Sequence, residues 1–397
     1  MQSTSPKHGI TREVALVSLA IFFADASHST VIPIFPGFAQ KVGASLSMLG
    51  SYGSVSALAL LLFSLPLGRL SDKYGRKRMM IPGLVLFILV PLSYLLVSSP
   101  LHLYPIRMLL GFGVGLIFSN GFLLMTEVAE PEFRNTAQGI YMTSMGIGFT
   151  IGPLIGGFTT KFYGVNVSFL FSAAFGALSL LLLYFVKEKH RVVLDKKPRE
   201  QITISSIVRD RKVLAAGVSN YLNSLMFNAL ALFFPVYGAS VGFDESQIGA
   251  SFTARGLAST IIRLPVGSLT KHIKALYLMV FGLVLSAVTI FGVSQFSVLI
   301  LVCIIMGVQG IAYGIILTSG NVYVSLNSDE DVRGTAMAVY SMFGNLSGII
   351  NPLILGLIAE TFSSKGALQF SSVMTLVGVV LVYYLAHDVD KKSEKLT

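Results

Sequence analysis

The chain of 397 residues is 53% hydrophobic and only 12% charged. Soluble globular domains contain about 25% charged residues, so this composition excludes an ordinary soluble domain and indicates a protein that folds in lipid. The net charge of +10 could indicate a nucleic-acid partner, but the placement of the basic residues, described below, argues against one.

Long apolar runs recur from one end of the chain to the other. A run of about 18 or more apolar residues can cross the ~30 Å of hydrocarbon in a bilayer. Because these runs are continuous rather than alternating, they indicate helices and not a β-barrel. The sequence therefore predicts an all-α membrane protein with twelve transmembrane helices, near residues 13–36, 47–69, 79–98, 103–127, 135–160, 167–186, 212–238, 247–269, 276–293, 297–325, 334–360 and 367–386.

The first span carries an acidic residue, Asp25, about midway along its length. An ionisable group at that depth is costly and marks a candidate functional site. Asp25 could exchange protons or contact a substrate, or it could make a fixed hydrogen bond between helices. His28 follows on the same helical face and has the same two interpretations. The small residues around Asp25 resemble a signal-peptide cleavage site, but the internal repeat described below indicates that this segment belongs to the folded protein.

A cluster of charge separates the second and third spans, with the sequence GRLSDKYGRKRM at residues 68–79. Gly75 permits a tight turn between two antiparallel helices. The basic side chains favour the cytoplasmic side of the membrane and anionic lipid head groups. On these grounds alone, the stretch is a loop that sets the topology.

Asp72 adds nothing to such a topological role, because an acid does not help to retain a loop in the cytoplasm. A carboxylate at a helix N-terminus is stabilised by about 0.3–1 kcal/mol. We therefore expect Asp72 to dock reversibly against the helix that starts near Gly334 when the central cavity faces outward. Arg76 or Lys73 would then pair with Glu127.

Three arginines lie within predicted spans. Arg107, near one end of the fourth span, could extend to the membrane surface or line a cavity and modulate a nearby proton site. Arg255 lies in the middle of the eighth span with no acid in the neighbouring turns, so we expect it to contact an anionic group. Arg263 is interfacial or part of a gate.

The fifth span carries Gly148, Gly152 and Gly156 at every fourth position. Such a stripe of small residues lets two helices approach closely in lipid, and Pro153 bends the helix by removing a backbone hydrogen bond. The stripe either serves tight packing alone or forms a bendable, well-sealed helix at the interface between two halves of the protein.

The chain matches itself when it is shifted by 199 residues. For example, FRNTAQGIY at 133–141 falls on VRGTAMAVY at 332–340, and IFPGF at 34–38 falls on FFPVY at 233–237. We expect two six-helix halves, 1–186 and 212–397, joined by a charged cytoplasmic linker at 187–211. Parallel repeats of this kind hold their substrate site near the membrane midplane between the halves.

Most lysines and arginines fall on one side of the predicted topology, whereas the loops of the other side contain Lys41, Lys161 and Lys365. This asymmetry places both termini in the cytoplasm, and it explains the net charge without a nucleic-acid partner. The single cysteine, Cys303, excludes a disulfide framework and a thiolate metal site. No motif for a cofactor or a metal is present.

Three patterns in the chain carry a resemblance to one known family. The first is G-x-L-x-D-[RK]-x-G-[RK]-[RK], matched by Gly68, Leu70, Asp72, Lys73, Gly75, Arg76 and Lys77. The second is partial, with Arg107, Gly111, Gly113 and Gly115 present but Leu110 in place of the usual glutamine. The third is complete and comprises Gly139, Gly148, Gly152, Pro153, Gly156 and Gly157. Through these patterns the whole chain resembles the major facilitator superfamily, although Lys271 and Asn351 interrupt the second-half copies.

The resemblance implies the major facilitator fold and a transport function. Within that family the third pattern is typical of antiporters that export drugs or metabolites against protons. We expect Asp25, His28 and Arg107 to couple protons, and a gate formed by Gly68, Asp72, Lys73, Gly75, Arg76, Lys77, Glu127 and Arg134. Polar residues in the spans predict a mostly apolar substrate cavity lined by Asn120, Tyr141, Asn223, Asn228, Arg255, Gln309, Tyr313 and Tyr340.

The sequence thus predicts a proton-coupled secondary transporter that exports small amphipathic drug-like or metabolite molecules and is not an enzyme. We expect a monomer in the cytoplasmic membrane, with a small-molecule substrate, protons and membrane lipids as partners and with no nucleic acid or cofactor. One alternative is a proton symporter that imports a small organic solute, for which Arg255 would hold a carboxylate. Another is a membrane receptor without transport, which the short loops disfavour.

Overall fold

The computed structural model describes residues 11–188, 207, 209–329 and 331–394. The first half contains α1 (Arg12–Val31), α2 (Phe35–Lys41), α3 (Leu46–Tyr74), α4 (Arg76–Tyr94), the 3-10 turn η1 (Pro100–His102), α5 (Leu103–Val114), the π-helical turn η2 (Gly115–Ser119), α6 (Asn120–Val128), the 3-10 turn η3 (Pro131–Phe133), α7 (Arg134–Tyr163) and α8 (Val165–Phe185). The second half contains α10 (Arg211–Ser240), α11 (Glu245–Leu269), α12 (Ala275–Val293), α13 (Leu299–Leu326), α14 (Arg333–Phe362) and α15 (Ser364–Glu394). Most of the predicted linker, 187–211, lies outside the described residues.

Ten helical stretches among the described residues are long and apolar enough to cross a membrane. The helices α7, with 30 residues, and α11, with 25 residues, are also long enough to cross a membrane, but they are richer in glycine, serine and threonine, which lowers their hydropathy. They pack against each other, and this contact shields part of their less apolar surface from lipid. The predicted all-α membrane fold with two repeated halves is confirmed.

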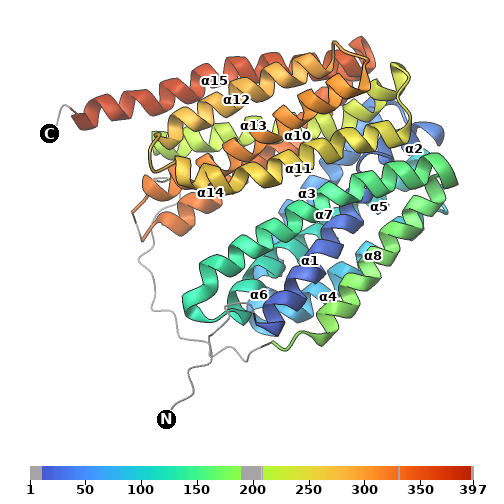
Figure 1. Cartoon of the computed structure of the whole chain (residues 1–397), viewed down its shortest axis with the longest axis horizontal. Coiled ribbons are helices and arrows are strands. Elements are labelled where there is room, and N and C mark those ends of the chain that lie inside the picture. The colour runs from blue at the N-terminus through green and yellow to red at the C-terminus, as the bar shows by residue number, and fades with distance from the viewer. Residues whose placement is uncertain (1–10, 189–206, 208, 330, 395–397) are drawn as a thin grey trace.

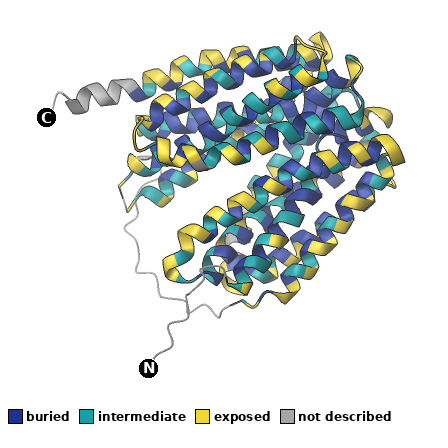
Figure 2. Ribbon diagram, in the orientation of Figure 1, coloured by how far each residue is buried: buried dark blue, intermediate teal, exposed yellow. Residues whose placement is uncertain are grey.

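The outer surface of the bundle is apolar. Large hydrophobic side chains on α15 and α8 are exposed, among them Val380 at 69% and Leu181 at 54%. Figure 2 shows such exposed positions along the outer helices, with buried positions concentrated between the helices. Apolar side chains are stable on this surface because they face lipid chains instead of water.

The two halves repeat one arrangement of helices. In the first half α1 packs against α7 and α8, and in the second half α10 packs against α14 and α15. Backbone conformation repeats at the same offset of 199 residues: Gly43 and Gly242 have φ of 94° and 91°, and Gly164 and Ser363 have φ of 88° and 101°. The helix starts repeat too, because the side chains of Ser45 and Asp244 cap α3 and α11.

The halves meet through two equivalent helix pairs, α7 with α11 and α3 with α14. Both contacts depend on glycine: a methyl group at Gly249 would lie 2.4 Å from the Pro153 carbonyl oxygen, and one at Gly50 would lie 2.0 Å from that of Pro352. We call the end of the molecule where these contacts lie the sealed end. At the opposite end, which carries both chain termini, the ribbons of the two halves lie apart (Figure 1).

Residues 68–79, which we predicted to form a loop, are almost entirely helical. Helix α3 continues to Tyr74 and α4 starts at Arg76, with only Gly75, at φ 96°, between them. The Glu188 carboxylate accepts hydrogen bonds from the backbone amides of Arg76 at 2.7 Å and Lys77 at 3.3 Å, so it caps the start of α4. The end of α3 and the start of α4 can carry charged residues, because both helices extend beyond the hydrocarbon to the head groups and water.

The glycine stripe of α7 faces its own half rather than the interface between halves. A methyl group at Gly148, Gly152 or Gly156 would lie within 2.1–2.6 Å of atoms of α1, namely Phe22 O, Ser29 Oγ and Thr30 O. The neighbouring face of α7 meets α11 instead, because a methyl group at Gly157 would lie 2.2 Å from the Glu245 carbonyl oxygen. The stripe therefore serves close packing with α1, whereas Pro153 and Gly157 of the same motif contact α11.

Candidate functional site

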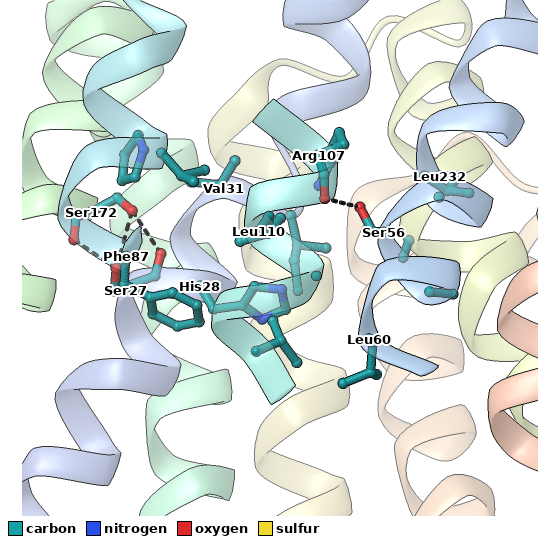
Figure 3. A pocket seen from close by; sticks show the side chains of 18 of the residues that line it. Ser27, His28, Val31, Ser56, Leu60, Phe87, Arg107, Leu110, Ser172 and Leu232 are labelled. Carbon is teal, nitrogen blue, oxygen red and sulfur yellow. Dashed lines mark hydrogen bonds between the residues drawn. The ribbon is translucent and has the colours of Figure 1, made fainter. Parts of the chain in front are cut away.

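A cavity of about 210 Å³ lies between α1, α3, α4, α5 and α8 of the first half and α10 of the second. Its wall is mostly apolar, with a few polar groups from different helices. Those used below are His28, Phe87, Tyr94, Arg107, Phe227 and Asn228. Figure 3 shows the His28 ring beside that of Phe87, and Arg107 near Ser56 on the neighbouring helix. Such a largely apolar cavity with a few polar groups is typical of small-molecule sites.

Arg107 is the charged residue in the cavity wall. Its guanidinium carbon lies 3.3 Å from the centre of the Phe35 ring, and its backbone carbonyl accepts a hydrogen bond of 2.8 Å from Ser56 Oγ. Its Nε is buried and has no hydrogen-bond partner in the described ranges of the chain. No acidic side chain among the described residues forms an ion pair with it. Arg107 is therefore a cation that is balanced by an aromatic face and not by a counter-ion.

Asp25 and His28 lie on one helix but contact different neighbours. His28 lines the cavity, with its ring centre 6.0 Å from that of Phe87 on α4. Asp25 is 5% exposed and packs on α7, because a methyl group at Gly148 would lie 3.0 Å from its Cβ. Within the part of the chain that the structure describes, its Oδ2 has no hydrogen-bond partner, and Arg263 of the second half acts on Asp25 electrostatically. Of these two residues predicted to couple protons, His28 therefore lies in the cavity wall, whereas Asp25 lies in the contact between α1 and α7.

Arg255 forms a second buried cationic centre, only 1% exposed, in the second half. Its Nε donates to Gln309 Oε1, whose amide nitrogen in turn donates to Ser286 Oγ at 3.1 Å. Three rings surround the guanidinium carbon, at 4.7, 5.3 and 5.9 Å from the ring centres of Tyr313, Phe227 and Phe149. Its Nη2 has no hydrogen-bond partner among the described residues, so the N–H donors of this nitrogen remain for a further group.

The two halves use equivalent positions differently. At an offset of 199 residues, Arg255, Gln309 and Ser286 correspond to Ser56, Leu110 and Phe87. Those three first-half residues line the cavity, whereas their second-half counterparts form the hydrogen-bonded network around Arg255. The space that the first half leaves open as a cavity is therefore filled by polar side chains in the second half.

The remaining predicted cavity residues fall into three groups. Asn120 and Tyr141 make fixed contacts inside the first half, because Asn120 bonds to Ser71 Oγ and the Leu116 carbonyl, and the Tyr141 hydroxyl donates to the Phe118 carbonyl at 2.8 Å. Asn228 lines the cavity. Asn223 Oδ1 and the Tyr340 hydroxyl are buried without a hydrogen-bond partner, as is typical of groups that await a ligand or water.

The predicted gate residues all belong to the first half, and the structure brings Asp72, Arg76 and Glu127 together. The Arg76 side chain, 6% exposed, lies 2.5 Å from Asp72 Oδ1 and 3.3 Å from Glu127 Oε1. Lys77 Nζ donates to the carbonyls of Tyr184 and Val186 at 2.8 and 2.6 Å. Gly68 lies within α3, Lys73 lies in its last turn, and Arg134 starts α7. The docking of Asp72 on the start of α14 concerns another conformation and stays a prediction.

Ion pairs join the two halves at the sealed end, and the sequence did not indicate them as functional. Lys161 Nζ lies 2.9 Å from Asp244 Oδ2, and Lys41 Nζ lies 3.7 Å from Glu245 Oε1. Burial alone would raise the pKa of Asp244, but hydrogen bonds from Ser246, Lys161 and the Gln247 amide lower this pKa to about 2. The feature of the sequence that could have indicated these ion pairs is that the two lysines lie in the first half and the two acidic residues in the second.

The aromatic residues around both arginines also went unpredicted. Phe35, Tyr94, Phe149 and Phe227 are indistinguishable in sequence from the many other aromatic residues of the spans. Their roles depend on which helices face each other, so no local pattern could have identified them.

Comparison with known proteins agrees with this architecture. The profile of the Major Facilitator Superfamily matches residues 17–239 and 216–397. Similar sequences include the Multi-drug resistance efflux pump PmrA homolog of Lactococcus lactis, 24% identical with 93% of each chain covered. Another is Multidrug resistance protein 1 of Bacillus subtilis, 22% identical with 94% of this chain and 96% of that protein covered.

Solved structures show the same fold at low identity. A bacterial homolog of the human lysosomal transporter Spinster, in an inward-facing and unoccupied conformation, has a TM-score of 0.77 at 14% identity, with 96% of this chain and 97% of that chain covered. The nucleoside transporter NupG also has a TM-score of 0.77, at 11% identity, with 94% of this chain and 99% of that chain covered. The repeated halves, the cavity between them and the profile match over most of the chain lead to one conclusion: this protein belongs to the Major Facilitator Superfamily and is a multi-pass membrane transporter of small molecules.

Proposed function

We propose that this protein is a proton-coupled secondary transporter that exports small amphipathic molecules by alternating access. It acts as a monomer in the cell membrane, surrounded by lipid, with both termini in the cytoplasm. The observation that carries the proposal is Asp25, a buried carboxylate in the middle of α1 with an unpartnered oxygen. Buried ionisable groups at this depth are typical of proton relays.

The position of Asp25 connects proton binding to the relative position of the halves. The residue belongs to the first half, whereas Arg263, which acts on it electrostatically, belongs to α11 of the second half. An ionised Asp25 attracts Arg263 across the interface, and a protonated Asp25 does not. Protonation of Asp25 therefore changes the free-energy difference between conformations in which α11 lies near Asp25 and conformations in which α11 lies farther away.

The arrangement of the halves supports a conformation that opens to the cytoplasm. The halves are joined at the sealed end by helix contacts and ion pairs and lie apart at the end of the termini (Figure 1). With cytoplasmic termini, as the distribution of lysine and arginine predicts, the cavity lies beneath the sealed outer end. A solved structure of the same fold is described as inward-facing, which agrees with this assignment.

The export direction is supported by the names of the relatives, which are efflux and multidrug resistance proteins, and by the glycine and proline pattern of α7. A second candidate function, proton symport of a small organic solute, is favoured by Arg107 and Arg255. Each has an unpartnered buried nitrogen that could hold a carboxylate.

Proton flux measured in proteoliposomes distinguishes these functions. We would use liposomes that enclose a pH-sensitive dye and add a permanently charged probe, either naphthalene-1-sulfonate or trimethyl(1-naphthyl)ammonium, to the outside. Antiport makes the lumen more alkaline as the probe enters, and symport makes it more acidic. Protein-free liposomes give the background.

Variants connect the response to Asp25. We expect Asp25→Asn to abolish the proton signal, whereas Glu132→Gln, which changes an exposed carboxylate next to α7, keeps it. An unchanged signal in Asp25→Asn contradicts the role of this residue, and the absence of any response in the parent protein contradicts proton-coupled transport of these probes.

A further inference from the structure

We propose that the cavity of the first half binds the charged end of an amphipathic organic anion, such as a carboxylate or sulfonate on an aromatic body, with Arg107 as its counter-ion. The proposal deepens the transport function and rests on it. It names the chemical class of the substrate, and it separates this protein from a pump for cationic drugs.

The charge of the cavity wall is the first argument. Arg107 lines the cavity and forms no ion pair with the described residues. None of the described residues that line the cavity is acidic. Asp25 packs on α7 and is not among the lining residues. A guanidinium whose Nε is buried without a counter-ion is costly, and an anionic ligand would reduce that cost.

The hydrogen-bond donors of the cavity are the second argument. Arg107 Nε and the Tyr94 hydroxyl are both buried without a partner, both residues line the cavity, and the two side chains interact electrostatically. A guanidinium has only donors, and a phenol can donate one hydrogen. A carboxylate or sulfonate accepts several such bonds, and charge-assisted bonds of this kind are the stronger ones.

The rest of the wall suits the apolar body of such a molecule. Phe87, Leu60, Leu110 and Phe227 contribute apolar surface from α4, α3, α5 and α10. Because Phe227 belongs to the second half, a ligand that reaches it contacts both halves at once. Phe227 also lies 5.3 Å from the Arg255 guanidinium, so a molecule in the cavity lies near a second cation as well.

The same geometry disfavours a cationic ligand. A positive group in this cavity would approach Arg107 in surroundings of low dielectric constant, where like charges repel strongly, and no lining carboxylate would offset the repulsion. Discrimination by sign of charge therefore follows from the lining residues and not from cavity size.

A binding measurement with two matched probes tests the proposal. Purified protein in detergent is titrated with naphthalene-1-sulfonate and with trimethyl(1-naphthyl)ammonium, which share a ring and differ in sign of charge. We expect the sulfonate to bind and the ammonium compound to bind at least about tenfold more weakly, because a charge-assisted bond contributes at least this much. Equal or tighter binding of the ammonium compound overturns the proposal.

Variants assign the binding to one arginine. In Arg107→Gln we expect sulfonate binding to weaken at least about tenfold, with Arg107→Lys intermediate because lysine keeps the charge but not the planar fork. Wild-type affinity in Arg107→Gln refutes the site. The thermal unfolding midpoint of each variant, measured without probe, shows whether the variant folds. If Arg107→Gln does not fold, the comparison of sulfonate binding between the parent protein and Arg107→Lys still tests the role of Arg107.

The proposed transport function has a separate outcome. Equilibrium binding needs no gradient, so a failure of proton coupling in proteoliposomes leaves the binding preference for anions intact. Conversely, a protein that moves protons with the ammonium probe but does not bind the sulfonate is a coupled transporter with another substrate class.

Discussion

Replacing Gly249 with alanine should open the sealed end. The added methyl group would lie 2.4 Å from the Pro153 carbonyl oxygen and 3.1 Å from the Gly157 Cα across the α7–α11 contact. Ordinary carbon–oxygen contacts need about 1 Å more, so the helices must separate. Overpacking of this kind costs about 1–3 kcal/mol. If the sealed conformation bears the whole cost, its population relative to the open one falls about five- to 150-fold.

The matched control is Gly267→Ala on the same helix, where a methyl group meets nothing within 4 Å. Both substitutions increase the intrinsic stability of the helix by up to about 1 kcal/mol. A difference in conformational equilibrium between the two variants therefore measures the effect of the contact with α7. We expect Gly267→Ala to leave the conformational equilibrium unchanged.

Distances between two spin labels measure the effect. Labels on cysteines introduced at Tyr163 and Thr361, in a Cys303→Ala background, report on the separation of α7 and α14 at the sealed end, because both positions are exposed. Gly249→Ala should add a population of longer distances. If its distance distribution equals that of Gly267→Ala, the glycine contact does not control the closure of this end.

Two further predictions concern charged and strained positions. The Asp244 pKa is lowered from 3.8 to about 2, so its ion pair with Lys161 stabilises the sealed end above about pH 4 and is lost as the pH falls toward 2. Label distances measured between pH 5 and 2 should lengthen less in Asp244→Asn than in the parent, and equal responses would contradict this linkage. Gly75→Ala should lower the thermal stability by about 1 kcal/mol or more, because the residue has φ 96° and a methyl group there would lie 2.9 Å from the Glu188 carboxylate. Calorimetry against Gly139→Ala, which meets nothing within 4 Å, checks this prediction, and equal midpoints would refute it.

The membrane helices and the two similar halves could be predicted from the sequence alone, because they depend on the linear pattern of residues and not on which helices pack together. Continuous apolar runs predict membrane helices whatever their partners, and the repeat at an offset of 199 residues predicts two similar halves. The structure shows the repeat even in backbone conformation, since Gly43 and Gly242 share a positive φ. The predicted helix ends near residues 68–79 were wrong, because a polar helix can continue beyond the hydrocarbon. Local hydropathy does not detect such an extension.

The composition and linear pattern of this sequence determined its class, the order of its long apolar helices, and the positions of its intramembrane charges. The tertiary structure alone decided which side chains meet. Only the packing of helices distant in sequence turns the glycine stripe of α7 toward α1 and separates Asp25 from the cavity that His28 lines. The same packing leaves Arg107 beside an aromatic ring, with no carboxylate of the described residues paired to it. The physical reason is that the charge of a side chain is a property of the residue, whereas its partner is a property of the packing between helices.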